Sequence, residues 1–195
     1  MLYFITGAEG SGKSACLLPL RRKFPLIAWY DFDEVGVPSF PTTAWRQRTT
    51  NFWVERALHH QHEQKDTGIC GQAVLGEILA CPSAPLINSI AVCFLDCGDL
   101  VRVDRMRAQG RTRVCQAQLN WASWQRMHIQ DPQWEPDTIR DQAEPWLLWE
   151  RWQDFQQGDP RWSAWVLDTT ALSLSQVIDK ISVWMALQHK NSVRV

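Results

Sequence analysis

The sequence is poor in the features that mark membrane, secreted or nucleic-acid-binding proteins. It has no apolar run long enough to span a bilayer, and no basic segment precedes its first apolar residues, so we expect neither a membrane span nor a secretion signal. The net charge is only −1, which provides no overall positive field for nucleic acid or an acidic membrane surface. We therefore expect a cytoplasmic protein that binds neither nucleic acid nor membranes.

Paired cysteines are also missing. The six cysteines, at positions 16, 70, 81, 93, 97 and 115, include no Cys-x-x-Cys pair, and several lie within apolar runs. This scatter favours buried free thiols in a reducing compartment over disulfides or a zinc site.

Tryptophan is in excess, with 12 copies. Trp146, Trp149 and Trp152 recur every third residue, as on one side of a helix. Such a helix would either pack in a core or stack on the bases of single-stranded nucleic acid. The nearby acids Glu144 and Glu150 favour core packing.

A chain of 195 residues predicts one domain, and its apolar runs alternate with helical patterns. The alternation predicts an α/β fold with a parallel sheet between two layers of helices. Residues 111–137 are expected to be the least regular part, with one short amphipathic stretch around Trp121. The predicted strands are 2–6, 26–30, 66–72, 90–95 and 165–167, and the predicted helices are 14–23, 42–64, 74–79, 99–109, 146–157 and 173–187.

The strongest motif is at residues 7–14, where GAEGSGKS fits the phosphate-binding pattern G-x-x-x-x-G-K-[ST] directly after the first predicted strand. Its glycines let the backbone curl around phosphate oxygens so that N–H groups converge on them. Lys13 is expected to reach the β- and γ-phosphates and Ser14 to ligate Mg²⁺, at the positive end of the following helix. The expected nucleotide-binding residues here are Gly7, Gly10, Ser11, Gly12, Lys13, Ser14 and Ala15.

Two acids, Asp31 and Asp33, follow the second predicted strand. The carboxyl ends of neighbouring parallel strands open into one crevice, which places both acids beside the γ-phosphate. Magnesium takes one or two carboxylates, so Asp31 is expected to bind it directly or through water. Asp33, two residues on along an extended chain, is expected to orient or deprotonate an acceptor hydroxyl. The alternative is a solvated strand end where an acid caps a helix.

In these motifs the chain resembles the nucleoside monophosphate kinase and shikimate kinase branch of the P-loop kinases, and also small bacterial AAA-type ATPases. The resemblance rests on the loop at 7–14, on Asp31 and Asp33, on DRMRAQGR at 104–111 and on LDTT at 167–170. It implies a three-layer P-loop NTPase fold with five parallel strands in the order 2-3-1-4-5. It also implies an acceptor-binding helical segment at about 36–66 and a helical lid at about 110–137 within the single domain 1–195.

The same resemblance assigns roles to four arginines. Arg105 or Arg107 would stack on the adenine, and Arg111 and Arg113 would bind phosphates when the lid closes. Each could instead be a solvated charge. Because phosphoryl transfer needs positioning and positive charge from the protein, the expected catalytic set is Lys13, Asp33, Arg111 and Arg113.

These features predict Mg²⁺-dependent phosphoryl transfer, with ATP as co-substrate, to a hydroxyl or phosphate of a small molecule. The acceptor is open between a nucleoside, a nucleotide, a sugar acid and another hydroxylated metabolite, and the sequence does not predict an oligomeric state. The alternative is a nucleotide-binding regulatory or interaction module with little or no ATPase activity. A kinase needs Asp33 as well as Asp31, whereas a binding module needs only the phosphate loop and the magnesium ligands.

Overall fold

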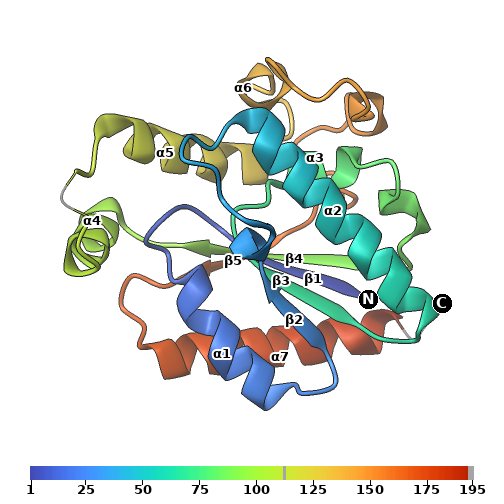
Figure 1. The fold of residues 1–195 in the computed structure, drawn as a ribbon, viewed down its shortest axis with the longest axis horizontal. Helices are drawn as coiled ribbons and strands as arrows, with labels where there is room; N and C mark the ends of the chain where they lie inside the picture. The colour runs from blue at the N-terminus through green and yellow to red at the C-terminus, as the bar shows by residue number, and fades with distance from the viewer. Residues whose placement is uncertain (112, 193–195) are drawn as a thin grey trace.

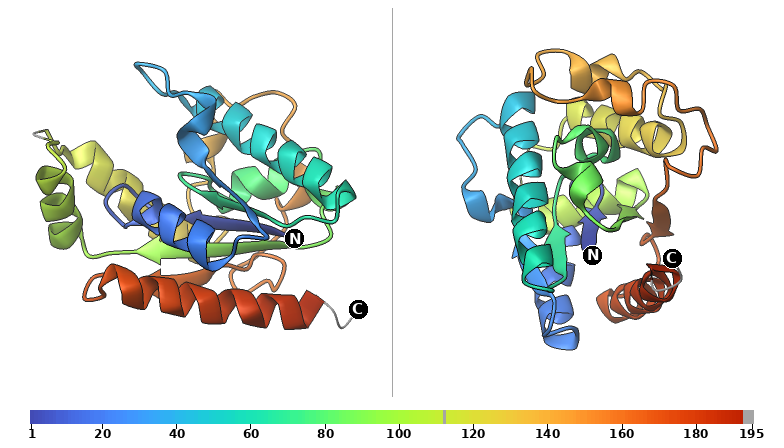
Figure 2. Two further views of the ribbon diagram at one scale, coloured as in Figure 1. Left: turned by 60° about the horizontal axis from the view of Figure 1, so that its bottom comes forward. Right: turned by 90° about the vertical axis from the view of Figure 1, so that its right-hand side faces the viewer.

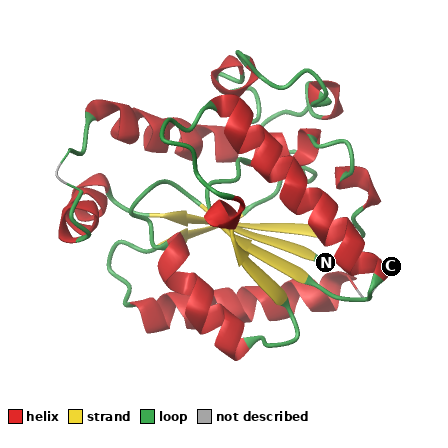
Figure 3. Cartoon of the chain, in the orientation of Figure 1, coloured by secondary structure: helices red, strands yellow, loops and turns green. Residues whose placement is uncertain are grey.

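The computed structural model describes residues 1–111 and 113–192, whose strands form one parallel sheet in the order β2-β3-β1-β4-β5. Helices lie on both faces of the sheet, which confirms the predicted three-layer P-loop fold (Figures 1 and 3). The strands are β1 (Leu2–Thr6), β2 (Ala28–Asp31), β3 (Thr67–Cys70), β4 (Ile90–Asp96) and β5 (Trp165–Asp168). The α-helices are α1 (Lys13–Lys23), α2 (Thr43–His62), α3 (Leu75–Ala80), α4 (Asp99–Ala108), α5 (Gln116–Gln130), α6 (Asp137–Arg140) and α7 (Leu174–Ser192), and the 3₁₀ helices are η1 (Phe32–Val35), η2 (Ala84–Leu86) and η3 (Trp149–Arg151).

Strand β1 lies at the centre of the sheet, and all of its side chains are buried. Leu2 and Phe4 face the core covered by α2, α3 and α5, whereas Tyr3 and Ile5 face the core covered by α1 and α7. A strand buried on both faces is mostly apolar, which is why the first four residues of this strand form a continuous apolar run before Thr6. The phosphate motif therefore leaves the sheet from the middle of its carboxyl edge.

The long helices begin and end close to the predicted residues. The hydroxyl of Thr42 accepts a hydrogen bond from the backbone N–H of Trp45 at 3.1 Å and so caps α2. Gly110, with φ of 82°, ends the turn after α4 in the left-handed conformation that glycine adopts without strain. Helix α7 runs along one face of the sheet (Figure 2). None of the described helices is long and apolar enough to cross a membrane.

The expectation of an irregular segment at 111–137 is wrong for its middle part, which forms α5 over 15 residues. The side chain of Gln118 accepts a hydrogen bond from the backbone N–H of Cys115 at 2.8 Å and caps this helix. Trp124 and Ile129 are buried in the core beside β4, so burial of one face stabilises a helix whose sequence is otherwise mostly polar.

The helix predicted at 146–157 is also wrong, because the structure has only the 3₁₀ helix η3 there. Backbone and side-chain bonds to α3 hold this segment: the N–H of Leu148 donates to the carbonyl of Ala80, and the indole of Trp152 to the carbonyl of Gly76, both at 2.9 Å. Trp152 is fully buried, which confirms core packing and excludes a base-stacking role for this residue.

Five of the six cysteines are buried free thiols, as predicted, and Cys115 is exposed. Cys70 and Cys93 flank Ile5 on the neighbouring strands, and burial raises the pKa of both thiols well above the ordinary value. Burial also raises the pKa of Cys16, in α1, to about 12. These thiols therefore stay protonated at neutral pH and act as core side chains. Cys115 departs from the prediction because it lies just before α5, where the chain is exposed.

Candidate functional site

The phosphate motif forms a tight loop between β1 and α1 that only glycines can make. A Cβ on Gly7, where φ is 141°, would lie 2.2 Å from the carbonyl oxygen of Leu95. A Cβ on Gly10, where φ is 80°, would lie 2.9 Å from the carbonyl oxygen of Arg102. Gly12 has φ of 108° directly before α1. Close packing against β4 and α4, together with positive φ, thus explains the spacing of the motif.

Arg102 of α4 forms hydrogen bonds that support this loop, and the sequence analysis did not predict this role. Its side chain is 1% exposed, and its Nε donates to the carbonyl of Glu9 at 2.8 Å. Its Nη1 donates to Asp99 at 2.6 Å, and its Nη2 lies 3.4 Å from the carbonyl of Gln118. The only signal in the sequence is its place four residues before Met106, on the buried face of the same helix.

Replacing Arg102 with methionine is expected to lower the melting temperature by roughly 5 °C. About 2 kcal/mol is lost when the partly buried carbonyl of Glu9 loses its side-chain donor and the carboxylate of Asp99 keeps only Arg126. Arg107→Met is the matched control, because Arg107 is exposed on the same helix. Its melting temperature should change by less than about 1 °C. Thermal denaturation followed by circular dichroism measures both, and equal shifts would contradict a supporting role for Arg102.

A pocket of about 110 Å³ opens above the loop at the carboxyl ends of β1, β2 and β3. The structure brings together here the residues predicted to bind phosphate and metal and to act on the acceptor: Lys13, Ser14, Asp31, Asp33 and Arg111 all line it. This agrees with the argument that neighbouring parallel strands share one crevice. The remaining lining residues are Glu9, Gly10, Gly12, Gly71, Gln72 and Gln109.

Lys13 carries its charge in a buried position, with 7% of the residue exposed and its Nζ donating to the carbonyl of Ala8 at 2.8 Å. Burial, and next the positive charge of Arg102, lower its pKa to about 8, although Asp33 and Asp31 oppose this. Nearby anionic groups, such as those of a bound triphosphate, would favour the charged form of Lys13.

The acids are arranged differently from the prediction. Strand β2 ends at Asp31, and Asp33 lies in η1 rather than on an extended chain. The carboxylate of Asp31 accepts a hydrogen bond from the N–H of Asp33 at 3.0 Å and so caps η1, and Asp33 is exposed. The alternative of an acid that caps a helix at the end of the strand is therefore also observed, although Asp31 lines the pocket as well. Burial, then the Asp31 carboxylate, raise the pKa of Asp33. The buried cation of Lys13 and the exposed carboxylate of Asp33 thus line the same pocket.

A second pocket, of about 220 Å³, adjoins the first through Gly10 and Gly12. Arg105 lies at its wall and donates through Nη2 to the carbonyl of Thr169 at 2.9 Å. The hydroxyl of Thr169 is 3.0 Å from the carbonyl oxygen of Ser11, so this residue joins the loop after β5 to the phosphate loop. The pocket is completed by Ser11, Ala15, Cys16, Gln109, Leu172, Leu174 and Val177.

Three predicted residues do not line either pocket: Gly7, at the start of the phosphate motif, and two arginines. Arg107 is exposed on α4, and Arg113 is exposed between α4 and α5. Neither lines either pocket. The pockets also contain polar residues that sequence reasoning did not assign to a site, chiefly Glu9 and Gln109. Glu9 contacts Arg102 and Gln118, which are 93 and 109 positions away in the chain, and no local pattern links it to either partner.

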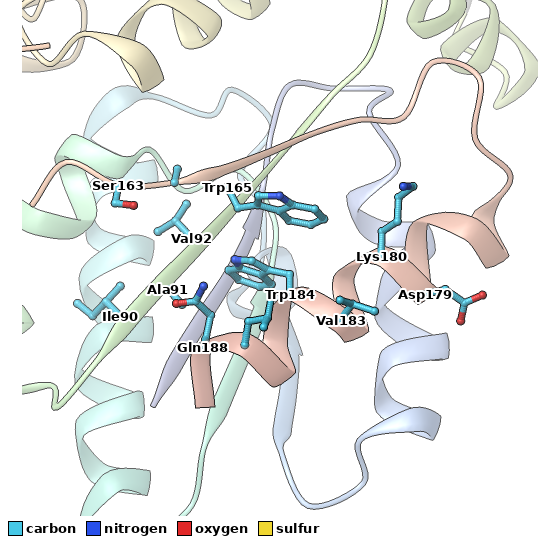
Figure 4. Close-up of a pocket in the computed structure, with 12 residues that line it drawn as sticks. Ile90, Ala91, Val92, Ser163, Trp165, Asp179, Lys180, Val183, Trp184 and Gln188 are labelled. Atoms are coloured by element: carbon cyan, nitrogen blue, oxygen red, sulfur yellow. The ribbon is translucent and has the colours of Figure 1, made fainter. Parts of the chain in front are cut away.

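A larger cavity, of about 860 Å³, lies elsewhere, between the amino-terminal half of β4, the start of β5 and α7 (Figure 4). Its most conspicuous feature is the pair of parallel indoles of Trp165 and Trp184, whose centroids are 5.8 Å apart. None of the residues predicted to bind nucleotide or metal lines it. It is therefore separate from the candidate site.

No protein-family model matches the sequence, and a search of curated proteins found no match. Among solved structures, a gluconokinase from Sinorhizobium meliloti 1021 is similar with a TM-score of 0.59 and 15% identity over 97% of this chain and 93% of that one. A sugar kinase from Janibacter sp. HTCC2649 has a TM-score of 0.54 and 14% identity, over 95% and 94% of the two chains. A shikimate kinase from Aquifex aeolicus vf5 has a TM-score of 0.52 and 16% identity, over 100% of both. The chain thus has the fold of P-loop kinases along almost its whole length.

Proposed function

We propose that the protein is a kinase that transfers a phosphoryl group from ATP to a hydroxyl or phosphate of a small molecule, with Mg²⁺. The observation that carries this proposal is the pocket in which Lys13 and Ser14 of the phosphate loop meet Asp31 and Asp33. A phosphate-binding loop alone would serve a binding module equally well. A carboxylate of raised pKa in the same pocket, here Asp33, is what a transfer reaction to a hydroxyl needs.

The two adjoining pockets fit the parts of a nucleoside triphosphate. The phosphates would lie over the glycine loop, where the hydroxyl of Ser11 is buried without a hydrogen-bond partner among the described residues. The base would lie in the larger pocket, between the guanidinium of Arg105 and the apolar side chains of α7. The expected adenine contact of Arg105 fits this arrangement, and its bond to Thr169 holds the guanidinium in place.

The donor set also fits magnesium. Ser14 and Asp31 offer two hard oxygen ligands beside the phosphate loop. A hydroxyl and one carboxylate suit Mg²⁺, which is held by one or two carboxylates, substrate phosphates and water. When bound, the ion would neutralise the phosphate oxygens at which negative charge develops.

The protein's own side chains would do the rest of the chemistry. Lys13 and Arg111 supply positive charge to the phosphoryl group in transit, and Arg113 would join them when the segment between α4 and α5 closes over the nucleotide. Asp33 would orient the acceptor hydroxyl and accept its proton. Acceptor contacts are proposed for Gln72 and the helical segment 36–66, which includes α2.

ATP turnover tests this proposal directly. The protein with Mg²⁺ is incubated with nucleosides, nucleoside monophosphates, gluconate-like and shikimate-like acids, and no acceptor, and ADP release is followed in a coupled assay. We expect one acceptor class to raise the rate at least 100-fold above the acceptor-free control. Tight ATP binding with a flat rate across the panel would contradict the kinase and favour a nucleotide-binding regulatory module.

A further inference from the structure

Glu9 stands at a position of the phosphate motif where any residue is allowed, yet both its backbone and its side chain make specific contacts. Its carbonyl accepts from Nε of the buried Arg102 at 2.8 Å, which fixes the backbone. Its carboxylate accepts through Oε2 from the side-chain amide of Gln118 at 2.8 Å and forms an ion pair with Arg111. Contacts from α4, α5 and the segment between them therefore converge on one residue of the loop.

Arg111 depends on this contact for its position. It follows Gly110 in the segment between α4 and α5, and its side chain is 56% exposed. Within residues 1–111 and 113–192, Glu9 is the one acid with which Arg111 forms an ion pair. A guanidinium has five N–H donors, so an arginine bound to one carboxylate still has donors for a phosphate. Both side chains line the same pocket as Lys13.

We infer that Glu9 is a positioning residue that holds the Arg111 guanidinium over the pocket lined by Lys13, here called the phosphate pocket, before the nucleotide binds. The inference rests on the phosphate-binding part of the proposed function. It follows from an electrostatic conflict, because a carboxylate in a pocket for a triphosphate repels the ligand unless a cation neutralises it. When Glu9 is paired with Arg111, its carboxylate repels the phosphates only weakly. The pair also orders the arginine side chain before the nucleotide binds, so binding loses less side-chain entropy.

Because of this pairing, the effect of Glu9 on the affinity for Mg²⁺–ATP should change sign when Arg111 is removed. With Arg111 present, Glu9→Gln removes the anchor, and Mg²⁺–ATP binding is expected to weaken about threefold. With Arg111→Gln already made, Glu9 is an unpaired carboxylate facing phosphate, and Glu9→Gln is expected to tighten binding about threefold. A double-mutant cycle isolates this coupling from the effect of either change alone.

The experiment measures the dissociation constant of Mg²⁺–ATP by calorimetry for the wild type, both single variants and the double variant. Glu150→Gln, an exposed acid in η3, is the matched control and should bind like the wild type. A reversal of sign between the two backgrounds supports the inference. Weaker binding in both would indicate a structural role in the loop, and tighter binding in both would indicate that Glu9 only competes with phosphate; either result overturns it.

This readout also separates the inference from the proposed function. Binding is measured without turnover, so a protein that binds ATP but phosphorylates no acceptor fails as a kinase while the cycle is still interpretable. Melting temperatures of all four proteins establish that each is folded. Glu9 is partly exposed and Arg111 mostly so, and we expect shifts below about 2 °C for both substitutions.

Discussion

Lys13→Met is expected to raise the dissociation constant for Mg²⁺–ATP at least 100-fold while the protein stays folded. Lys13 is buried and lines the pocket proposed to bind phosphate, and methionine keeps the length and apolar stem of the side chain while removing the charge. Loss of charge-assisted contacts to two phosphates is worth about 3 kcal/mol, which corresponds to a factor of about 100. Calorimetry with the nucleotide measures this directly.

The same substitution is expected to stabilise the nucleotide-free protein. Folding lowers the pKa of Lys13 from 10.5 to about 8, mainly by burial, so the charged form is disfavoured in the folded state by roughly 3 kcal/mol. Methionine avoids this cost, and the melting temperature at pH 7 should rise by several degrees. Between pH 8 and 10.5 the unfolded wild-type chain binds more protons at this site than the folded one, so this contribution makes the wild type more stable as pH rises. The advantage of Lys13→Met should shrink over that range.

Lys180→Met serves as the control, because Lys180 is exposed on α7 and far from the phosphate loop in sequence. It should change neither ATP affinity nor the dependence of the melting temperature on pH. Unchanged ATP affinity in folded Lys13→Met protein would remove the phosphate loop from the candidate site.

The sequence predicted the sheet and the phosphate loop because both are determined locally. A strand such as β1 is buried on both faces, and its run of apolar residues indicates this burial directly. The glycines of the loop are required by backbone conformation at their own positions, so the motif is visible without any knowledge of the fold. The order of the strands came from the resemblance of several such motifs to known kinases.

The parts that sequence reasoning missed are determined by contacts between distant residues. The pair Arg102 and Glu9, 93 positions apart, fixes the phosphate loop. Glu9 stands at a position of the motif where any residue is allowed, so no local pattern links it to Arg102. Trp152 was placed correctly in the core but in the wrong backbone conformation, because its hydrogen bond to Gly76 replaces the bonds of a regular helix. Tertiary contacts override the local three-residue spacing there.

Asp33 was predicted only in part from the sequence. The sequence placed it beside Asp31 at the carboxyl end of β2, and in the structure both acids line one pocket with Lys13. The extended chain on which that prediction was based is absent, since Asp31 caps η1 and Asp33 is within it. The crevice between parallel strands, rather than the alternation of side chains along one strand, brings the two acids to the phosphate loop.

Asp33→Asn is expected to lower acceptor-dependent kcat at least 100-fold and to change the dissociation constant for Mg²⁺–ATP by less than about threefold. The asparagine keeps the shape and can still hydrogen-bond, but it cannot accept the proton of the acceptor hydroxyl, and such general base catalysis is worth about 100-fold or more. Steady-state kinetics with the acceptor identified in the panel, together with calorimetry, separate the two quantities. Wild-type turnover in the variant would exclude Asp33 as the base.

The pH dependence of kcat gives an independent test of the same residue. Burial and the Asp31 carboxylate raise the pKa of Asp33, and a general base works only when deprotonated. The wild-type rate should therefore fall as pH decreases through a pKa above the ordinary value for aspartate, and this acid limb should disappear in Asp33→Asn. Asp31→Asn is the matched comparison two residues away: it should mainly raise the Mg²⁺ concentration required for activity and, by removing a neighbouring negative charge, shift the acid limb to lower pH. An acid limb that persists in Asp33→Asn would assign the titration to another group.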